Sequence, residues 1–122
     1  MTQCSVVPPE THWRAALADG RFLIQRDPVD GTTYFPPRLA GPKGQSLEWV
    51  EASGLGTVYA VSVIYPKPPQ QPYNVVLVDL EEGARMMSRV ESERPEDIAI
   101  GDPVRARIAA TDDGMQIVFH PA

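Results

Sequence analysis

The sequence predicts a mainly β protein with one N-terminal helix and a small barrel of the OB type. Three observations carry this prediction. Helical periodicity occurs once, in residues 10–19. Proline makes up 13 of the 122 residues, about twice the usual share, which rules out a large helical bundle. Five or six short strand-like runs, separated by turn residues, follow one another from residue 47 onwards. A β-sandwich is the main alternative, but its seven strands are hard to count here.

Residues 10–19 form the predicted helix. Trp13, Ala16 and Leu17 lie at positions i, i+3 and i+4, which places them on one apolar stripe. Gly20 follows at the position where a C-terminal glycine cap is typical. A helix this short needs a packing partner to persist, so we expect the stripe to face another element.

Residues 21–46 predict a small lobe. Short strands are expected at 21–26 and 32–35, joined by the turn cluster at 27–31. Proline and glycine in residues 36–44 exclude regular structure there. The lobe has almost no core of its own, so we expect it to open more readily than the barrel.

The sequence predicts three parts. Residues 1–20 form a leader and the helix, residues 21–46 form the lobe, and residues 47–122 form the OB barrel. The pattern alternates between apolar and polar residues, or is β-branched throughout, as strands require. Strands are expected at 47–52, 57–65, 73–80, 84–90, 104–110 and 115–119, with one helical turn at 95–98. In the fifth of these, the pattern places Val104, Ala106, Ile108 and Ala110 on the buried face.

Charge and composition disfavour several function classes. The formal charge is −5, and residues 79–102 hold eight acidic side chains against three arginines, so this surface repels phosphate. No stretch approaches the roughly 20 apolar residues of a membrane helix. Cys4 is the single cysteine and cannot form an intramolecular disulfide. We expect a cytoplasmic, soluble protein that binds neither membrane nor nucleic acid.

The sequence holds no recognisable catalytic pattern. His12 and His120 have no partner at a metal-binding spacing, and the thiol of Cys4 has no neighbouring histidine. The acidic pairs 81–82 and 112–113 occupy turns, where carboxylates commonly bond the backbone. We therefore expect no catalytic residue in this chain.

Aromatic residues are the more informative candidates. Tyr34 and Phe35 precede two prolines and Arg38, an arrangement that could hold a cofactor tail, contact a partner or simply pack. A second group lies on the expected barrel strands and could stack bases or fill the barrel. Its members are Trp49, Tyr59, Tyr65 and Tyr73.

Seven segments, in this order, resemble one family. They are Arg21-Phe-Leu-Ile-Gln-Arg26, Tyr34-Phe-Pro-Pro-Arg38, Leu47-Glu-Trp-Val-Glu51, Gly54-Leu-Gly-Thr-Val-Tyr59, Pro72-Tyr-Asn-Val-Val76, Leu80-Glu-Glu-Gly-Ala-Arg85 and Ile98-Ala-Ile-Gly-Asp-Pro-Val104. This order resembles the zinc-ribbon and OB-fold proteins catalogued as domain of unknown function thirty-five. These are acyl-CoA-associated partners of thiolase-like enzymes. The resemblance covers residues 10–122.

The resemblance implies a helix, a rubredoxin-like zinc ribbon and an OB barrel. Its members associate with thiolases, acyltransferases of that fold or thiolase-like aldolases, and they usually lack catalytic residues of their own. The family pattern has a C-x2-C pair in each turn of the ribbon. Here these positions fall on Asp27, Asp30, Gly41 and Gly44, so every thiolate is missing. We expect a degenerate ribbon without zinc, because two carboxylates do not complete a four-coordinate site.

The resulting hypothesis is a non-catalytic accessory subunit of a thiolase-like enzyme, with acyl-CoA as a further ligand. Tyr34, Phe35, Arg38 and Trp49 are the candidate partner contacts, and Arg38 is also the candidate for a CoA phosphate. The alternative is a free-standing OB module for single-stranded nucleic acid. A third hypothesis, an independent acyl-CoA hydratase or thioesterase, needs an acid–base pair that the sequence does not offer.

Overall fold

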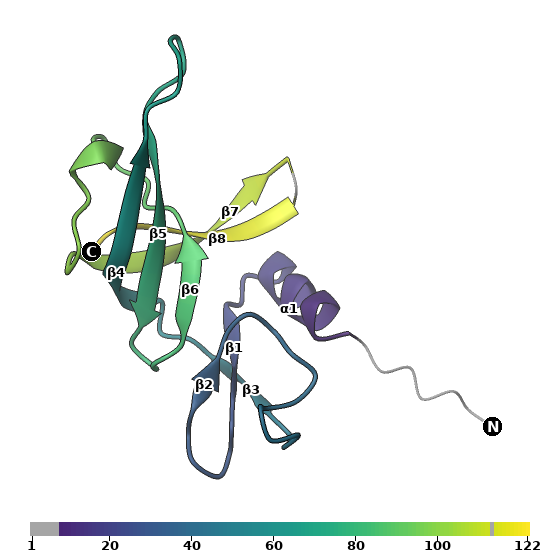
Figure 1. Cartoon of the computed structure of the whole chain (residues 1–122). Coiled ribbons are helices and arrows are strands. Elements are labelled where there is room, and N and C mark those ends of the chain that lie inside the picture. Colours follow the sequence, from purple (N-terminus) through teal and green to yellow (C-terminus); the bar gives the residue numbers. More distant parts are fainter. Residues whose placement is uncertain (1–7, 113) are drawn as a thin grey trace.

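The computed structural model of the protein describes residues 8–112 and 114–122. One α-helix, eight strands and one short 3-10 helix make up this part of the chain (Figure 1). They are α1 (Pro9–Ala18), β1 (Leu23–Arg26), β2 (Thr33–Tyr34), β3 (Glu48–Glu51), β4 (Leu55–Ile64), β5 (Tyr73–Leu80), β6 (Arg85–Ser88), η1 (Pro95–Asp97), β7 (Pro103–Thr111) and β8 (Gly114–Pro121). The predicted class, mainly β with one N-terminal helix, is confirmed. Cys4 lies outside the described residues.

Five strands form a nearly closed barrel in the order β6-β5-β4-β7-β8. The long strand β4 pairs with β5 along most of its length and with β7 at its start. A register shift between Val58 and Ala60 marks a bulge in β4, which supplies the bend that a small barrel needs. The two edges approach where Val90 bridges Phe119 in parallel, which closes the barrel at this end. The predicted OB-type barrel is confirmed.

A separate three-stranded sheet has the order β2-β1-β3. Strand β3 pairs with β1 in antiparallel register, with Ile24 opposite Val50. The sequence prediction that this strand opens the barrel was therefore wrong. The alternation of apolar and polar residues does not show which sheet a strand joins, because the small sheet and the barrel each have one buried face. The chain enters the barrel only after Gly54, whose φ of +85° suits the turn into β4.

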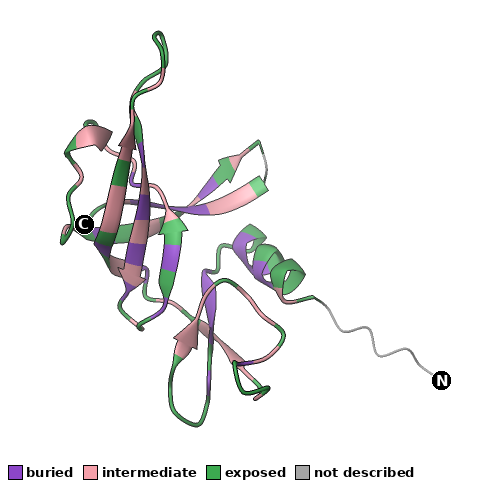
Figure 2. Cartoon of the chain, viewed as in Figure 1, coloured by how far each residue is buried: buried purple, intermediate pink, exposed green. Residues whose placement is uncertain are grey.

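One hydrophobic cluster joins the helix, the small sheet and the barrel. Trp13 and Leu17 of α1, Ile24 of β1 and Phe119 of β8 all belong to it. Figure 2 shows buried positions on one side of α1, along β1 and along β5. The indole N–H of Trp13 donates to the carbonyl oxygen of Leu23 at 2.9 Å, which fixes the helix against β1. The lobe therefore shares its core with the barrel.

The burial pattern of β7 departs from the predicted alternation near its end. Val104 is buried and Ala106 and Ile108 are half-buried, as the pattern indicates. Ala109 is then buried and Ala110 exposed, so the prediction for Ala110 was wrong. The end of β7 and the start of β8 extend past the other barrel strands (Figure 1), so packing against the barrel interior does not determine which face of β7 is buried there.

The described helices do not include one that is long and apolar enough to cross a membrane.

Glu91 offers a test of how the barrel closes. It follows β6 and pairs with Arg107 of β7 and with Arg89, whose guanidinium lies 3.1 Å from Oε2. Burial raises the pKa of the Glu91 carboxyl, but the hydrogen bonds from Arg107 and Arg89 outweigh it, and the net pKa is lowered. Glu91 therefore contributes stability above its unfolded pKa and loses it as the pH falls through the folded value.

We expect Glu91→Gln to lower the melting temperature at neutral pH by a few degrees. The cost is about 1 kcal/mol or less, because the pair is partly exposed to solvent. The difference from the unmodified protein should shrink as the pH falls below the ordinary pKa of a glutamate and through the lowered pKa of Glu91. Thermal melts across this range check it, with the exposed Glu93→Gln as the matched control. A difference that does not depend on pH contradicts the assigned role.

Candidate functional site

A shallow hollow between α1 and the small sheet brings together two of the predicted contact residues, Arg38 and Trp49. Its volume is about 210 Å³. It is lined by Pro9, His12, Gln25, Arg38, Leu39, Leu47 and Trp49. The helix supplies one wall, β1 and β3 supply the floor, and the loop after β2 supplies the other wall.

Trp49 lies half-buried at the edge of the core, against the helix. Its ring centroid lies 4.8 Å from that of His12, with an angle of 35° between the planes. His12 is exposed, as predicted, but its ring contact with Trp49 was not predicted. The contact joins residues far apart in the chain, so no local spacing reveals it. It fixes where β3 meets the start of α1.

Arg38 is held through its backbone and leaves its charged end available. Its N–H donates to Gln25 Oε1 at 2.8 Å, and Gln25 Nε2 donates to the Arg38 carbonyl oxygen at 2.7 Å. The guanidinium lies over the ring of Tyr34 at 5.0 Å. Arg38 forms no ion pair with another described residue. The Arg38 guanidinium is therefore a positive charge that no described carboxylate pairs with, on a residue whose backbone is held by Gln25.

Phe35 lies apart from this group and packs inward. Its ring meets Trp13 edge-on at 5.4 Å, and it packs against the hydrophobic core. It lines a different hollow of about 280 Å³, together with Met86 and Met87 of β6. Packing is the role that the geometry gives Phe35, and its predicted contact with a partner stays a prediction.

Leu39 is a candidate that sequence reasoning missed. It is 79% exposed, although it lies beside the hollow of Arg38 and Trp49. The sequence did offer one sign of it, because a large apolar residue is unexpected in a loop rich in proline and glycine. We define the lobe surface as His12, Tyr34, Arg38, Leu39 and Trp49.

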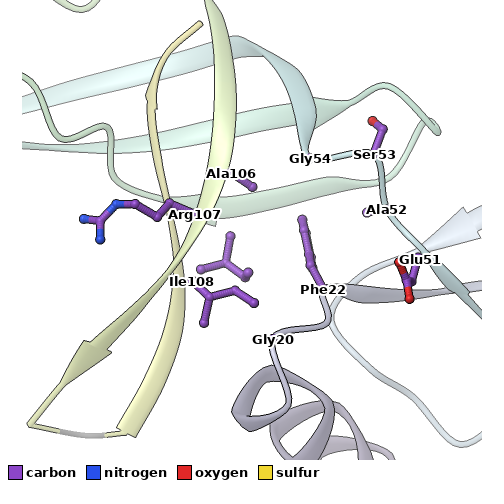
Figure 3. Close-up of a pocket in the computed structure, with 10 residues that line it drawn as sticks. Gly20, Phe22, Glu51, Ala52, Ser53, Gly54, Ala106, Arg107 and Ile108 are labelled. Atoms are coloured by element: carbon purple, nitrogen blue, oxygen red, sulfur yellow. The ribbon is translucent and has the colours of Figure 1, made fainter.

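A second pocket lies between the small sheet and the barrel, with a volume of about 310 Å³. Figure 3 shows the Phe22 side chain pointing towards Gly54 and Ala106, while the Arg107 side chain extends away from them. Both charged residues of the lining have partners: Arg107 pairs with Glu91, and Glu51 accepts from Arg21 at 3.0 Å. This pocket offers apolar surface and backbone atoms rather than an acid–base pair.

The four ribbon positions do not form a zinc-binding set. Asp27 is buried and Asp30 is exposed, while Gly41 and Gly44 carry no ligand atom. A hydrogen bond from the Val29 N–H, followed by one from the Gln45 amide, lowers the pKa of Asp27. The described residues contain no cluster of three or more histidine, cysteine, aspartate or glutamate side chains that could hold a metal ion.

Comparison with known proteins places this arrangement in a family. Residues 49–109 match the family model described as "ChsH2, C-terminal OB-fold domain". The solved structure titled "Ltp2-ChsH2(DUF35) aldolase" has a chain that is 32% identical, with a TM-score of 0.77 and 98% of each chain covered. The chain belongs to the DUF35 family. The recognition made from the seven sequence segments is thereby confirmed.

Two curated relatives are similar to large parts of this chain. The "Probable enoyl-CoA hydratase alpha subunit" of Thermomonospora curvata is 35% identical over 116 residues. The match covers 90% of this chain but 36% of that relative. The "DUF35 domain-containing scaffold protein" of Methanocaldococcus jannaschii is 40% identical over 83 residues, covering 62% of this chain and 59% of the relative. This chain therefore spans about a third to three fifths of these relatives.

We expect Phe35→Ala to destabilise the protein because it removes the aromatic contact with Trp13 and leaves a void beside the core. A loss of about 1–3 kcal/mol is expected for a half-buried ring, or several degrees in melting temperature. Leu39→Ala is the matched control, since that side chain is mostly exposed. Equal melting temperatures for the two variants would show that Phe35 is not a packing residue.

Proposed function

We propose that this DUF35 chain is a non-catalytic accessory subunit that docks on a thiolase-like enzyme through the lobe surface. The names of two relatives support an accessory role: one solved structure is named an Ltp2-ChsH2(DUF35) aldolase, and a curated relative is named a DUF35 domain-containing scaffold protein. Two longer relatives are named as hydratase alpha subunits, but this chain matches only about a third of the length of each. Their names therefore do not assign hydratase activity to the part that this chain matches.

The observation that carries the proposal is the composition and exposure of the lobe surface. Tryptophan, tyrosine and arginine dominate binding energy at protein interfaces, and each is present here at least partly accessible. Leu39 adds an exposed apolar side chain, and Arg38 adds a charge that forms no ion pair within residues 8–112 and 114–122. A partner that covers the lobe surface would bury the apolar side chain of Leu39 and could form an ion pair with Arg38.

Arg38 is also the residue through which we propose contact with acyl-CoA. A guanidinium matches the geometry of a phosphate and can bind it through two N–H groups. The hollow beside it, at about 210 Å³, lies below the roughly 300–1,000 Å³ range of small-molecule pockets. It suits one phosphate end of CoA, with the partner enzyme enclosing the remainder.

The nucleic-acid alternative has less support. Tyr59 is covered by the Arg85 guanidinium, which lies 3.4 Å from the ring centroid. Tyr65, directly after β4, and Tyr73, at the start of β5, are exposed, but the acidic run at 79–102 repels a phosphate backbone. We propose that the chain binds no nucleic acid.

Docking is tested by tagging the chain in its native cell, capturing its partner and identifying it by mass spectrometry. We expect a thiolase-like enzyme in the capture. Leu39→Glu and Arg38→Ala should then each weaken co-elution with that enzyme about tenfold, a loss of about 1.4 kcal/mol. Melting temperatures should stay within a few degrees, because both changes lie at the surface.

Ile100→Glu is the matched control, since Ile100 is 69% exposed and belongs to the barrel region. Loss of co-elution in this control but not in Leu39→Glu would place the docking surface on the barrel. Turnover of an acyl-CoA by the purified chain alone would contradict the non-catalytic role.

A further inference from the structure

We propose that a hydrogen-bonded cluster centred on Asp27 and Gln45 holds the lobe where related ribbons hold zinc, and that the lobe folds without metal. The cluster joins the two turns of the lobe, 27–32 and 41–45, through side chains rather than through a shared ion. The inference is independent of the proposed docking function.

The two turns are similar but not equivalent. In the first, the Asp27 N–H donates to the Thr32 carbonyl oxygen at 2.8 Å, five positions on. In the second, the Gly41 N–H donates to the Gln45 carbonyl oxygen at 2.8 Å, four positions on. The second turn is therefore one residue shorter, although both contain a glycine with φ near +80°. The two pairs of ribbon positions have the same spacing in the sequence, Asp27 with Asp30 and Gly41 with Gly44, but the turns that contain them differ in length.

The Asp27 carboxylate links the two turns. Its Oδ1 accepts from the Val29 N–H at 2.8 Å within the first turn. Its Oδ2 accepts from the Gln45 amide nitrogen at 3.0 Å in the second turn. Gln45 Oε1 in turn accepts from the Lys43 N–H at 2.8 Å. Hydrogen bonds to an ionised carboxylate are among the stronger ones, so this chain of contacts can hold both turns.

The Gln45 amide fills the space that a side chain at position 41 would use. A Cβ placed on Gly41 would lie 2.3 Å from Gln45 Cδ, so the two cannot coexist without a shift. A ligand at position 41 and the Gln45 bridge are thus mutually exclusive. The absence of a side chain at Gly41 is what allows the amide to reach Asp27.

The residues present do not fit zinc. A structural zinc site is closed by four sulfur, nitrogen or oxygen ligands. Asp30 Oδ1 already accepts from the Thr32 N–H at 2.9 Å, and Asp27 already binds two donors. Gly41 and Gly44 add no ligand, which leaves at most two carboxylates, both engaged in the turns.

The first test measures metal on the full chain as purified without added zinc. We expect far less than one zinc ion per chain by elemental analysis, and a melting temperature that a strong chelator leaves unchanged. One zinc per chain, or a chelator-dependent fall in the melting temperature, would overturn the proposal.

The second test asks whether Gln45 acts by filling the Gly41 space, using a double-mutant cycle. Gln45→Ala should lower the melting temperature by about 3–8 °C and speed amide exchange at Lys43 about tenfold. Gly41→Ala should cost a similar amount in the unmodified protein, because it displaces the amide. In the Gln45→Ala background it should cost little, because the space is then empty.

Gln70→Ala is the matched control, since Gln70 is exposed in a loop and contributes a backbone N–H alone. It should leave the melting temperature unchanged. Additive effects of Gly41→Ala and Gln45→Ala, or a Gln45→Ala variant as stable as Gln70→Ala, would contradict the bridge. If either variant fails to fold, exchange at Lys43 in the Asp27→Asn variant decides the same point. Asn keeps an oxygen for the Val29 N–H but presents an NH2 group, which cannot accept, to the Gln45 amide. Faster exchange at Lys43 supports the bridge, and unchanged exchange contradicts it.

Discussion

Strand β1 is the element on which the other parts of this molecule depend. Leu23 and Ile24 are buried in the hydrophobic cluster that also contains residues of the helix and the barrel. The carbonyl oxygen of Leu23 receives the Trp13 indole N–H, and the side chain of Gln25 clamps the backbone of Arg38. The same four-residue strand pairs with β2 and β3. It therefore sets where the helix, the lobe and the lobe surface lie relative to the barrel.

The sequence predicts those features that a local pattern determines. The stripe of Trp13, Ala16 and Leu17 predicted the buried face of α1, and the β5 bounds at 73–80 were predicted without error. The sheet partner of β3 was not predictable, because the alternating pattern of a strand does not identify the strand with which it pairs. The Asp27–Gln45 bridge was missed for a similar reason: residues eighteen positions apart meet through a loop without periodic structure.

The grouping of the candidate residues was predicted in part, and their role in binding stays a prediction. Aromatic and arginine residues in the lobe indicated a binding surface, and Arg38 does lie near both Tyr34 and Trp49. Composition could not show that Phe35 turns into the core while Leu39, four positions later, turns outward. That distinction depends on how the loop after β2 crosses α1, which is a tertiary property. Within the lobe surface, Gln25 holds the Arg38 backbone through two hydrogen bonds, and the Leu39 side chain is exposed.

Hydrogen exchange can locate the surface of this chain that the partner covers. Exchange is compared for the chain alone and for its complex with the captured enzyme. If the lobe surface docks, exchange slows in residues 36–47, around Arg38 and Leu39, with little change in β5 and β6. Protection confined to the barrel strands, with the lobe unchanged, would contradict docking through the lobe surface.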